Sequence, residues 1–556
     1  MHVLSSILLL LGLAFSSVDP RIVTTSLGKL EGVELGEFHI FKKVPFSKPP
    51  LGKLRFQKPV PPARWHDVLN AKEYGPACMS NYSRSRTIQK VLDEDCLHLN
   101  IFTSEKCLKS KECAVVDYIH GGALHYDSAV MFNDAVILNN FVSKDIVFVI
   151  PAFRLGIFSH FVVEDQSIAP NNVGLFDILL AMEFVKSEIN NFGGDSNRIT
   201  LLGHSYGGTL AAMLTFSTEV NRDLSLFQQC ISMSAPSNFE TLELQMEKTV
   251  RFAEEANCIP KTSKNLKSSQ KELYMRDCLQ KIDAKELLRI QRKLEEEEFP
   301  TYGGSVLRGP IFQEVPETKF LDTPKNVSTL TGCTKYEILP FDSYDNIGLS
   351  LGFENWKEVN AKYQRDRENE ELGFPSTIRD ETQEMFVQTK ARVDKLLKKG
   401  IPTFQYELSY PKHSGHSDDL FYVMGVHPYE MDENEEKIGE TYRAMITNFI
   451  KTGKPGNGFE MTDLKTASYF DVCWNETSGE RPMMKSNFEQ KILKYWTKDM
   501  VRFDSNISKL KQKTVSRSIR SFNSPFAGIL IAKYCCSGDQ RNLYIQIDGS
   551  DYPIKS

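Results

Sequence analysis

The sequence predicts an α/β fold with a mostly parallel central sheet. Three short apolar runs carry this prediction, at residues 114–119, 146–150 and 199–202. Glycine or proline closely follows each run, and helical patterns separate them, as expected for parallel strands buried on both faces. The chain has 556 residues, 41% of them hydrophobic, which is enough for one large α/β domain with insertions.

The other elements are expected in the following order. Residues 21–33 form short strands, and six prolines between residues 45 and 62 exclude regular helix there. Residues 179–189 carry apolar side chains near a helical period. Residues 241–299 are strongly helical and charged, which predicts a helical cap inserted beside the sheet. Residues 442–450 form a further helix.

The N-terminus has the features of a secretory signal peptide over residues 1–17. Its apolar core, Val3 to Phe15, is too short to span a membrane, and Ser16 and Ser17 fit a cleavage region. An uncleaved anchor is the alternative. No later stretch has the apolar length of a spanning helix, and the last three residues do not form a retention signal. We therefore expect a secreted or ER-lumenal protein, with secretion favoured.

We predict one α/β domain over residues 18–500 and a basic C-terminal tail over residues 501–556. The tail carries Lys509, Lys511, Lys513, Arg517 and Arg520. A solvated, disordered extension is the expected form of this tract, and a membrane-surface or partner contact is the alternative. The sequence carries no signal for the oligomeric state.

Entry into the secretory pathway would allow the 11 cysteines to form disulfides and four sequons to be glycosylated. An oxidising compartment favours disulfides, and the odd count leaves at least one cysteine unpaired. The plausible glycan sites are Asn81, Asn326, Asn475 and Asn506. No cysteines and histidines have zinc-site spacing, and the net charge of −5 is not that of a nucleic-acid-binding domain. We expect no metal, no cofactor and no nucleic-acid partner.

Ser205 lies in Gly-His-Ser-Tyr-Gly, which matches the pattern G-x-S-x-G. A strand-like run precedes the motif and a helix-like run, residues 209–216, follows it. This is the setting of the nucleophile elbow in the α/β-hydrolase fold. The turn is so tight that side chains two residues before and after the serine would collide with backbone. His204 precedes Ser205 at the strand end, so its side chain should point away from that of Ser205.

A nucleophilic serine needs a base, an orienting acid and backbone donors for an oxyanion. The histidines well downstream of Ser205 are His413, His416 and His427, and residue order alone does not choose the acid. A glycine-rich loop at residues 120–123 follows a predicted strand. An oxyanion loop is favoured there over a plain turn.

Several segments, in the same order along residues 23–455, resemble the type-B carboxylesterase and cholinesterase family. They are Lys-Pro-Pro-Leu-Gly-Lys-Leu-Arg-Phe at 48–56, Glu-Asp-Cys-Leu-His-Leu-Asn at 94–100, Asn-Val-Gly-Leu-Phe-Asp at 172–177 and Phe-Gly-Gly-Asp at 192–195. The segment at 332–337 resembles the family's G-x-x-x-x-E, and Gly-His-Ser-Asp-Asp-Leu at 415–420 resembles its histidine segment.

The resemblance implies a complete catalytic apparatus. Ser205 would be the nucleophile, His416 the base and Glu337 the orienting acid. The oxyanion donors would be the backbone N–H groups of Gly122, Ala123 and Tyr206. Two family disulfides also find partners, Cys78 with Cys96 and Cys258 with Cys278. Cys107 and Cys113 flank a short insert and could close a small loop.

Three departures from the family refine the expected function. His204 and Tyr206 replace the glutamate and alanine of the usual G-E-S-A-G, and residues 78–96 lack the tryptophan that holds choline in cholinesterases. The resemblance therefore implies a carboxylesterase acting on a small-molecule ester, not a cholinesterase. The alternatives are acyl transfer by the same triad and a non-catalytic, neuroligin-like binding protein. Activity should rise through roughly pH 6–7, where imidazole titrates.

Overall fold

The structure is a computed structural model of the chain. It describes residues 21–80, 91–236, 241–261, 266–298, 302–303, 321–337, 347–521, 544–547 and 550–553. The predicted signal peptide and the sequon at Asn81 lie outside these residues.

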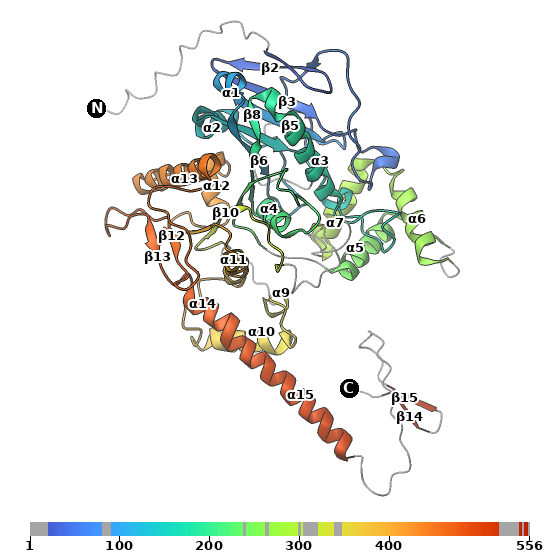
Figure 1. The fold of residues 1–556 in the computed structure, drawn as a ribbon. Coiled ribbons are helices and arrows are strands. Elements are labelled where there is room, and N and C mark those ends of the chain that lie inside the picture. The colour runs from blue at the N-terminus through green and yellow to red at the C-terminus, as the bar shows by residue number, and fades with distance from the viewer. Residues whose placement is uncertain are drawn as a thin grey trace, which may run out of the picture. The chain divides into compact units, whose positions relative to one another are not determined.

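A mostly parallel sheet forms the centre of the main part of the chain, residues 21–344 with 373–493 (Figure 1). Its parallel strands follow the order β7-β6-β8-β9-β10-β11-β12. Their bounds are β6 Cys113–Ile119, β7 Ile146–Pro151, β8 Gly194–His204, β9 Gln229–Met233, β10 Ser328–Thr334, β11 Thr403–Leu408 and β12 Tyr469–Asp471. The three predicted apolar runs correspond to β6, β7 and β8, which confirms the predicted strands and their parallel pairing.

Antiparallel strands extend this sheet at both ends. On the β7 side the order is β1-β2-β3-β5-β7, and β13 pairs with β12 at the other end. Their bounds are β1 Arg21–Thr24, β2 Lys29–Leu35, β3 Phe38–Pro45, β5 His98–Ser104 and β13 Met483–Lys485, and the short β4 (Leu69–Asn70) pairs with β2. Hairpin-like edges of this kind need no helical crossover, unlike the parallel centre.

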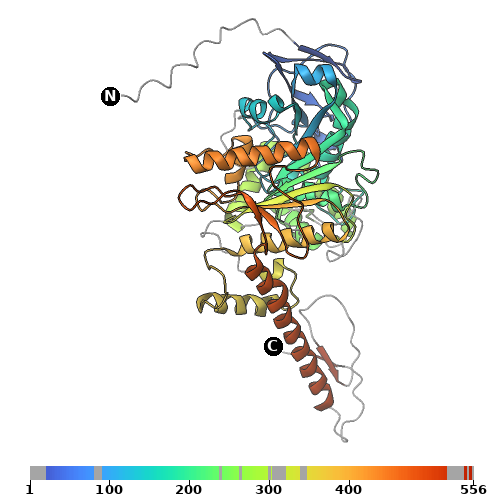
Figure 2. The same ribbon diagram turned by 60° about the vertical axis from the view of Figure 1, so that its left-hand side comes forward.

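Helices cover the sheet and connect its parallel strands. They are α1 Glu105–Ser110, α2 Asp134–Asn140, α3 Val173–Glu188, α4 Tyr206–Phe216, α11 Asp380–Lys398, α12 Asp418–Met424, α13 Glu433–Thr452 and α14 Gln490–Lys494. Helices α3 and α4 are buried along most of their length, since α3 packs on β6 and β8 and α4 on β8 and β9. Figure 2 shows α13, in orange, running along one side of the strands. The helix predicted at 442–450 is the second half of α13.

The predicted helical insertion consists of α5 (Leu242–Glu255), α6 (Ser268–Leu279) and α7 (Ala284–Glu298). These helices bury a second hydrophobic cluster, separate from the one under the sheet, that includes Phe252, Leu279 and Leu294. The disulfide Cys258–Cys278 joins the loop after α5 to α6. This cluster also contains Phe56 and Phe161, so the insertion shares its core with neighbouring loops and has a covalent link within it.

Two further disulfides join Cys78 to Cys96 and Cys107 to Cys113. All three bonds have the pairings expected from the sequence. Three cysteines in the described residues are free and buried, namely Cys230, Cys333 and Cys473. Of the sequon asparagines, Asn326 and Asn506 are exposed and Asn475 is half-buried. Glycosylation of these sites stays a prediction.

A second compact unit combines residues 345–372 with residues from 494 onward. It contains α9 (Ile347–Ser350), α10 (Trp356–Glu368), a π-helical turn at Tyr495–Met500, α15 (Val501–Ser521) and the hairpin β14 (Tyr544–Ile547) and β15 (Ser550–Pro553). Within it, Trp496 packs against Tyr363 at a ring distance of 5.1 Å.

The basic tract at 501–521 is helical in this structure and is not the disordered extension expected from its composition. At the start of α15, the carboxylate of Asp504 accepts a hydrogen bond from the backbone of Asn355 (2.8 Å). Such contacts order residues that composition alone describes as solvated. The predicted division at residue 500 stays a prediction. In the part of the chain that the structure describes, no helix has the length and apolar character needed to cross a membrane.

Asp117 is an unusual residue in the central strand β6. Its side chain is 1% exposed, and neither carboxylate oxygen has a hydrogen-bond partner among the described residues. Burial raises the pKa of Asp117 from 3.8 to about 7. Because the folded protein binds this proton more tightly than the unfolded chain, stability is greatest below the unfolded pKa and falls as the pH rises towards 7.

We predict that Asp117→Asn stabilises the protein, and more at pH 8 than at pH 5. The buried charge costs up to ~4 kcal/mol once it ionises in the folded state. Thermal unfolding midpoints at the two pH values measure the difference. The exposed Asp67→Asn is the matched control. A gain of equal size at both pH values would contradict the buried-charge explanation.

Candidate active site

Ser205 lies in a sharp turn between β8 and α4. Its backbone has φ 55° and ψ −130°, which is a strained conformation for a residue with a side chain. The N–H of Ser205 donates to the carbonyl of Met233 (2.9 Å), which ties the turn to the end of β9. The turn leaves Ser205 half-exposed, although the four residues on either side of it are buried.

The glycines that flank Ser205 are required by close backbone contacts. A Cβ atom on Gly203 would collide with the carbonyl of Gly207, and one on Gly207 would collide with the carbonyl of Ile119. Only glycine lets the strand end, the helix start and the neighbouring strand approach this closely. These contacts confirm the tight turn that the motif predicts.

A continuous hydrogen-bond chain runs from Ser205 to Glu337. The Oγ of Ser205 is 2.8 Å from Nε2 of His416, and Nδ1 of His416 is 2.6 Å from Oε2 of Glu337. Glu337 follows β10, and His416 lies in the loop between β11 and α12. The N–H of His416 also donates to the carbonyl of Glu337 (2.7 Å), so the two loops are joined through their backbones.

Glu337 is a buried carboxylate with several donors. Its Oε1 accepts hydrogen bonds from the hydroxyl of Ser234 and the N–H of Thr334, both at 2.6 Å. Burial would raise the pKa of Glu337, but the bond and charge of His416, followed by these two donors, lower it below its ordinary value. Glu337 is therefore charged and fixed in orientation.

The pKa of His416 is raised above its ordinary value. Burial acts in the opposite direction, but the hydrogen bond and the negative charge of Glu337 outweigh it. A more basic imidazole accepts a proton from a hydroxyl more readily. The arrangement can therefore activate Ser205 as a nucleophile.

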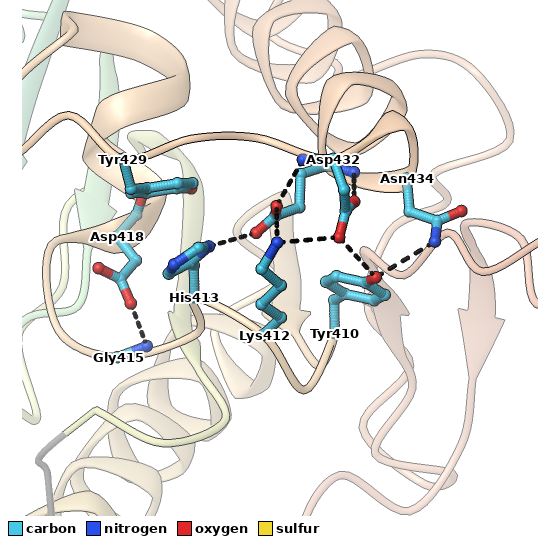
Figure 3. A network of polar contacts seen from close by, with 9 residues as sticks. Tyr410, Lys412, His413, Gly415, Asp418, Tyr429, Asp432 and Asn434 are labelled. Atoms are coloured by element: carbon cyan, nitrogen blue, oxygen red, sulfur yellow. Dashed lines mark hydrogen bonds and ion pairs between the residues drawn. The ribbon is translucent and has the colours of Figure 1, made fainter.

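The other two downstream histidines are not part of the hydrogen-bond network from Ser205 to Glu337. The Nδ1–H group of His413 donates to Glu435 (2.6 Å), and its ring stacks on Tyr429 with ring centroids 4.0 Å apart (Figure 3). His427 has a left-handed backbone. Of the three candidates left open by residue order, the structure brings only His416 to Ser205.

The network around His413 anchors the loop that carries His416. Glu435 caps α13 together with Asp432, and Lys412 lies within 3.3 Å of the Glu435 carboxylate (Figure 3). In the same loop, the N–H of Gly415 donates to Asp418 (2.8 Å). These contacts hold both sides of the loop in place around His416.

The loop after β6 lies against Ser205. A Cβ atom on Gly121 would be 3.1 Å from the Cβ of Ser205, and the next residues, Gly122 and Ala123, have φ of 99° and 49°. Successive residues with positive φ turn the chain sharply and orient backbone N–H groups differently from those of a strand. Tyr206 follows Ser205 directly and is the first residue of α4, so its backbone N–H lies at the start of that helix.

The helical insertion supports this loop. The carbonyl of Leu124 accepts a hydrogen bond from the N–H of Gly156 (2.8 Å). The side chain of Gln291 on α7 accepts one from the N–H of the next residue, Ile157 (2.9 Å). Nδ1 of His125 lies 3.4 Å from the Glu295 carboxylate, also on α7. The predicted cap thus contacts the segment proposed to bind an oxyanion.

Sequence reasoning missed Ser234. It follows β9 directly and donates to the carboxylate that orients His416. The strand before it, β9, was not predicted from the sequence, so its place at the carboxyl end of a parallel strand, where polar side chains from several strands meet, gave no signal. Within the described residues, no three histidine, cysteine or acidic side chains are arranged to hold a metal ion.

Comparison with known proteins assigns the chain to a family. The family model described as "Carboxylesterase family" matches residues 19–399 and 382–504. The chain belongs to the carboxylesterase family. This family implies the α/β-hydrolase fold, in agreement with the open, mostly parallel sheet.

Two gut esterases and several carboxylesterases are among the relatives. Gut esterase 1 of Caenorhabditis elegans is 39% identical over 216 residues, which cover 39% of this chain and 37% of the relative. Gut esterase 1 of Caenorhabditis briggsae is 35% identical over 237 residues, or 43% of this chain and 41% of the relative. This chain thus spans about two fifths of the gut esterases it matches. Carboxylesterase 1E of Mus musculus is 28% identical over 507 residues, covering 79% of this chain and 86% of the relative.

We predict that Glu337→Gln lowers kcat by ~10²–10⁴-fold with little change in KM, because the neutral amide no longer stabilises the imidazolium of His416. Steady-state kinetics with a chromogenic ester measure the effect. Glu188→Gln is the control, since Glu188 is also buried but bonds to Ser26 away from the site. Equal activity of the two variants would contradict the role of Glu337.

Proposed function

We propose that this protein is a serine hydrolase that cleaves carboxylic esters through an acyl-enzyme on Ser205. The observation that carries the proposal is the hydrogen-bond chain from Ser205 through His416 to Glu337. Membership of the carboxylesterase family and relatives named as esterases support ester hydrolysis in general.

The proposed reaction begins when His416 removes the proton of the Ser205 hydroxyl as its oxygen attacks the ester carbonyl. The negative charge that forms on the carbonyl oxygen is bound by the backbone N–H groups of Gly122, Ala123 and Tyr206. His416 then gives its proton to the leaving alcohol. Water, activated by His416, releases the acid from Ser205 in the second half of the reaction.

Two structural features support a role in the secretory pathway. The described residues contain three disulfides, and such bonds persist in oxidising compartments. Two of the sequon asparagines, Asn326 and Asn506, are exposed enough to carry glycans. We therefore propose a secreted or ER-lumenal enzyme with a small-molecule ester as substrate.

A fluorophosphonate probe tests the nucleophile directly. We expect it to label the purified protein and not the Ser205→Ala variant, because only an activated serine reacts with the probe. Circular dichroism of both proteins controls for folding. Folded wild-type protein that does not label would contradict the hydrolase and favour a non-catalytic binding protein. An added alcohol that appears as a new ester among the products would identify acyl transfer.

The pH dependence tests the base. His416 must be neutral to accept a proton, so kcat/KM should rise with pH and level off. Because the hydrogen bond and charge of Glu337 raise the pKa of His416, the midpoint should lie above that of an unperturbed imidazole. A profile of kcat/KM between pH 5 and 9 measures the midpoint. A flat profile would contradict His416 as the base.

A further inference from the structure

His204, the residue before the nucleophile, is a buried imidazole that the proposed reaction does not use. Its side chain is 2% exposed, and its Nε2 lies 3.6 Å from Oδ1 of Asp419. Within the described residues, neither of these two atoms has a hydrogen-bond partner, and 3.6 Å is an ion-pair distance. Buried polar atoms rarely remain unpaired, so each is the natural partner of the other.

Asp419 comes from a different part of the chain and is fully buried. It lies in the first turn of α12, three residues after His416, and its Oδ2 accepts a hydrogen bond from the hydroxyl of Tyr442 on α13 (3.0 Å). One oxygen of the carboxylate is therefore fixed by Tyr442, and the other faces His204. A buried carboxylate held in this way keeps a constant position.

The His204 ring also lies beside the ring of His416. The two ring centroids are 5.1 Å apart, with an angle of 40° between the planes. Both nitrogens of His416 are already engaged, by Glu337 and Ser205, so His204 contacts the ring without competing for them. Packing against the ring limits its rotation away from Ser205.

We propose that His204 and Asp419 form a positioning pair for His416. In this pair, His204 packs beside the His416 ring and keeps it between Glu337 and Ser205. The carboxylate of Asp419 holds His204 in place and adds a second negative charge near the imidazolium that forms during reaction. The inference rests on the proposed function, because it assigns the pair to the same serine and base.

The charged groups around His416 come from three helices and loops. Glu337 contacts it directly, and Asp419 on α12 and Glu381 on α11 act at longer range. All three carboxylates raise the pKa of His416 against the effect of burial, and His204 on β8 contributes the neighbouring ring. Of these three carboxylates, Asp419 is the one that lies against His204.

The pair replaces a pattern that is usual in the family. The family motif has glutamate where this chain has His204. A glutamate facing Asp419 would bring two carboxylates together, and like charges at short distance disfavour each other. An imidazole at this position instead places Nε2 of His204 3.6 Å from Oδ1 of Asp419, so an imidazole–carboxylate contact lies next to the base.

The test compares the pH profile of kcat/KM in wild-type protein, Asp419→Asn and His204→Gln. Fluorophosphonate titration first counts the active sites, so that rates refer to folded, reactive enzyme. We expect Asp419→Asn to move the midpoint down by about half to one pH unit, because a nearby negative charge is lost. Asp419→Glu, which keeps the negative charge, should have the same midpoint as the wild-type protein. We expect His204→Gln to lower kcat ~10-fold with KM nearly unchanged.

A matched control separates positioning from general damage to the core. His39 is another buried histidine beside a carboxylate, Glu105, and it lies on β3 outside the site. His39→Gln should leave both kcat and the midpoint unchanged. An equal loss of kcat in His39→Gln and His204→Gln would overturn the proposal.

The remaining outcomes also decide the matter. An unchanged midpoint in labelled Asp419→Asn overturns the electrostatic part of the proposal. If that variant does not fold, His204→Gln carries the test, and an unchanged kcat overturns the pair. Wild-type protein that does not label at Ser205 is a different failure, because it overturns the proposed function and this inference with it.

Discussion

The backbone conformation of Ser205 is the constraint on which the rest of the site depends. With φ 55° and ψ −130°, Ser205 can neither continue β8 nor begin α4, so its side chain projects from the turn between them. The glycines at 203 and 207 make that turn possible because any side chain there would meet backbone atoms. Strain of this kind persists only where the surrounding strands and helix are rigid. The fully buried β6 and α4 and the buried second half of β8 provide that rigidity.

The parallel sheet explains how distant residues meet at Ser205. The glycine-rich loop follows β6, Ser205 follows β8, Ser234 follows β9, Glu337 follows β10 and His416 lies in the loop after β11. The carboxyl ends of parallel strands lie at one edge of a sheet, so these loops converge there. Buried in that edge, Glu337 keeps its charge because His416, Ser234 and Thr334 all donate to it.

Features that distinguish this chain from the family pattern lie next to the reacting groups. His204 faces Asp419, and Tyr206 begins α4 with a buried side chain where alanine is usual. Ala123 adopts a left-handed conformation at a position where glycine is usual, so the loop carries some strain. The helical insertion contacts that loop through Glu295, which lies 3.4 Å from His125, and it contacts the segment after β7 through Gln291.

The sequence by itself determined the α/β class, the three central strands, the helical insertion and the turn at Ser205. These follow from local rules, namely apolar runs, helical periodicity and the space that only glycine leaves. Residue order alone did not choose between His413, His416 and His427, and it did not indicate Ser234 or the pairing of His204 with Asp419. Composition also described residues 501–521 as disordered, whereas they form a helix. Only the tertiary structure decided these points, because they depend on strand order and on contacts between residues far apart in the chain, which no local pattern encodes.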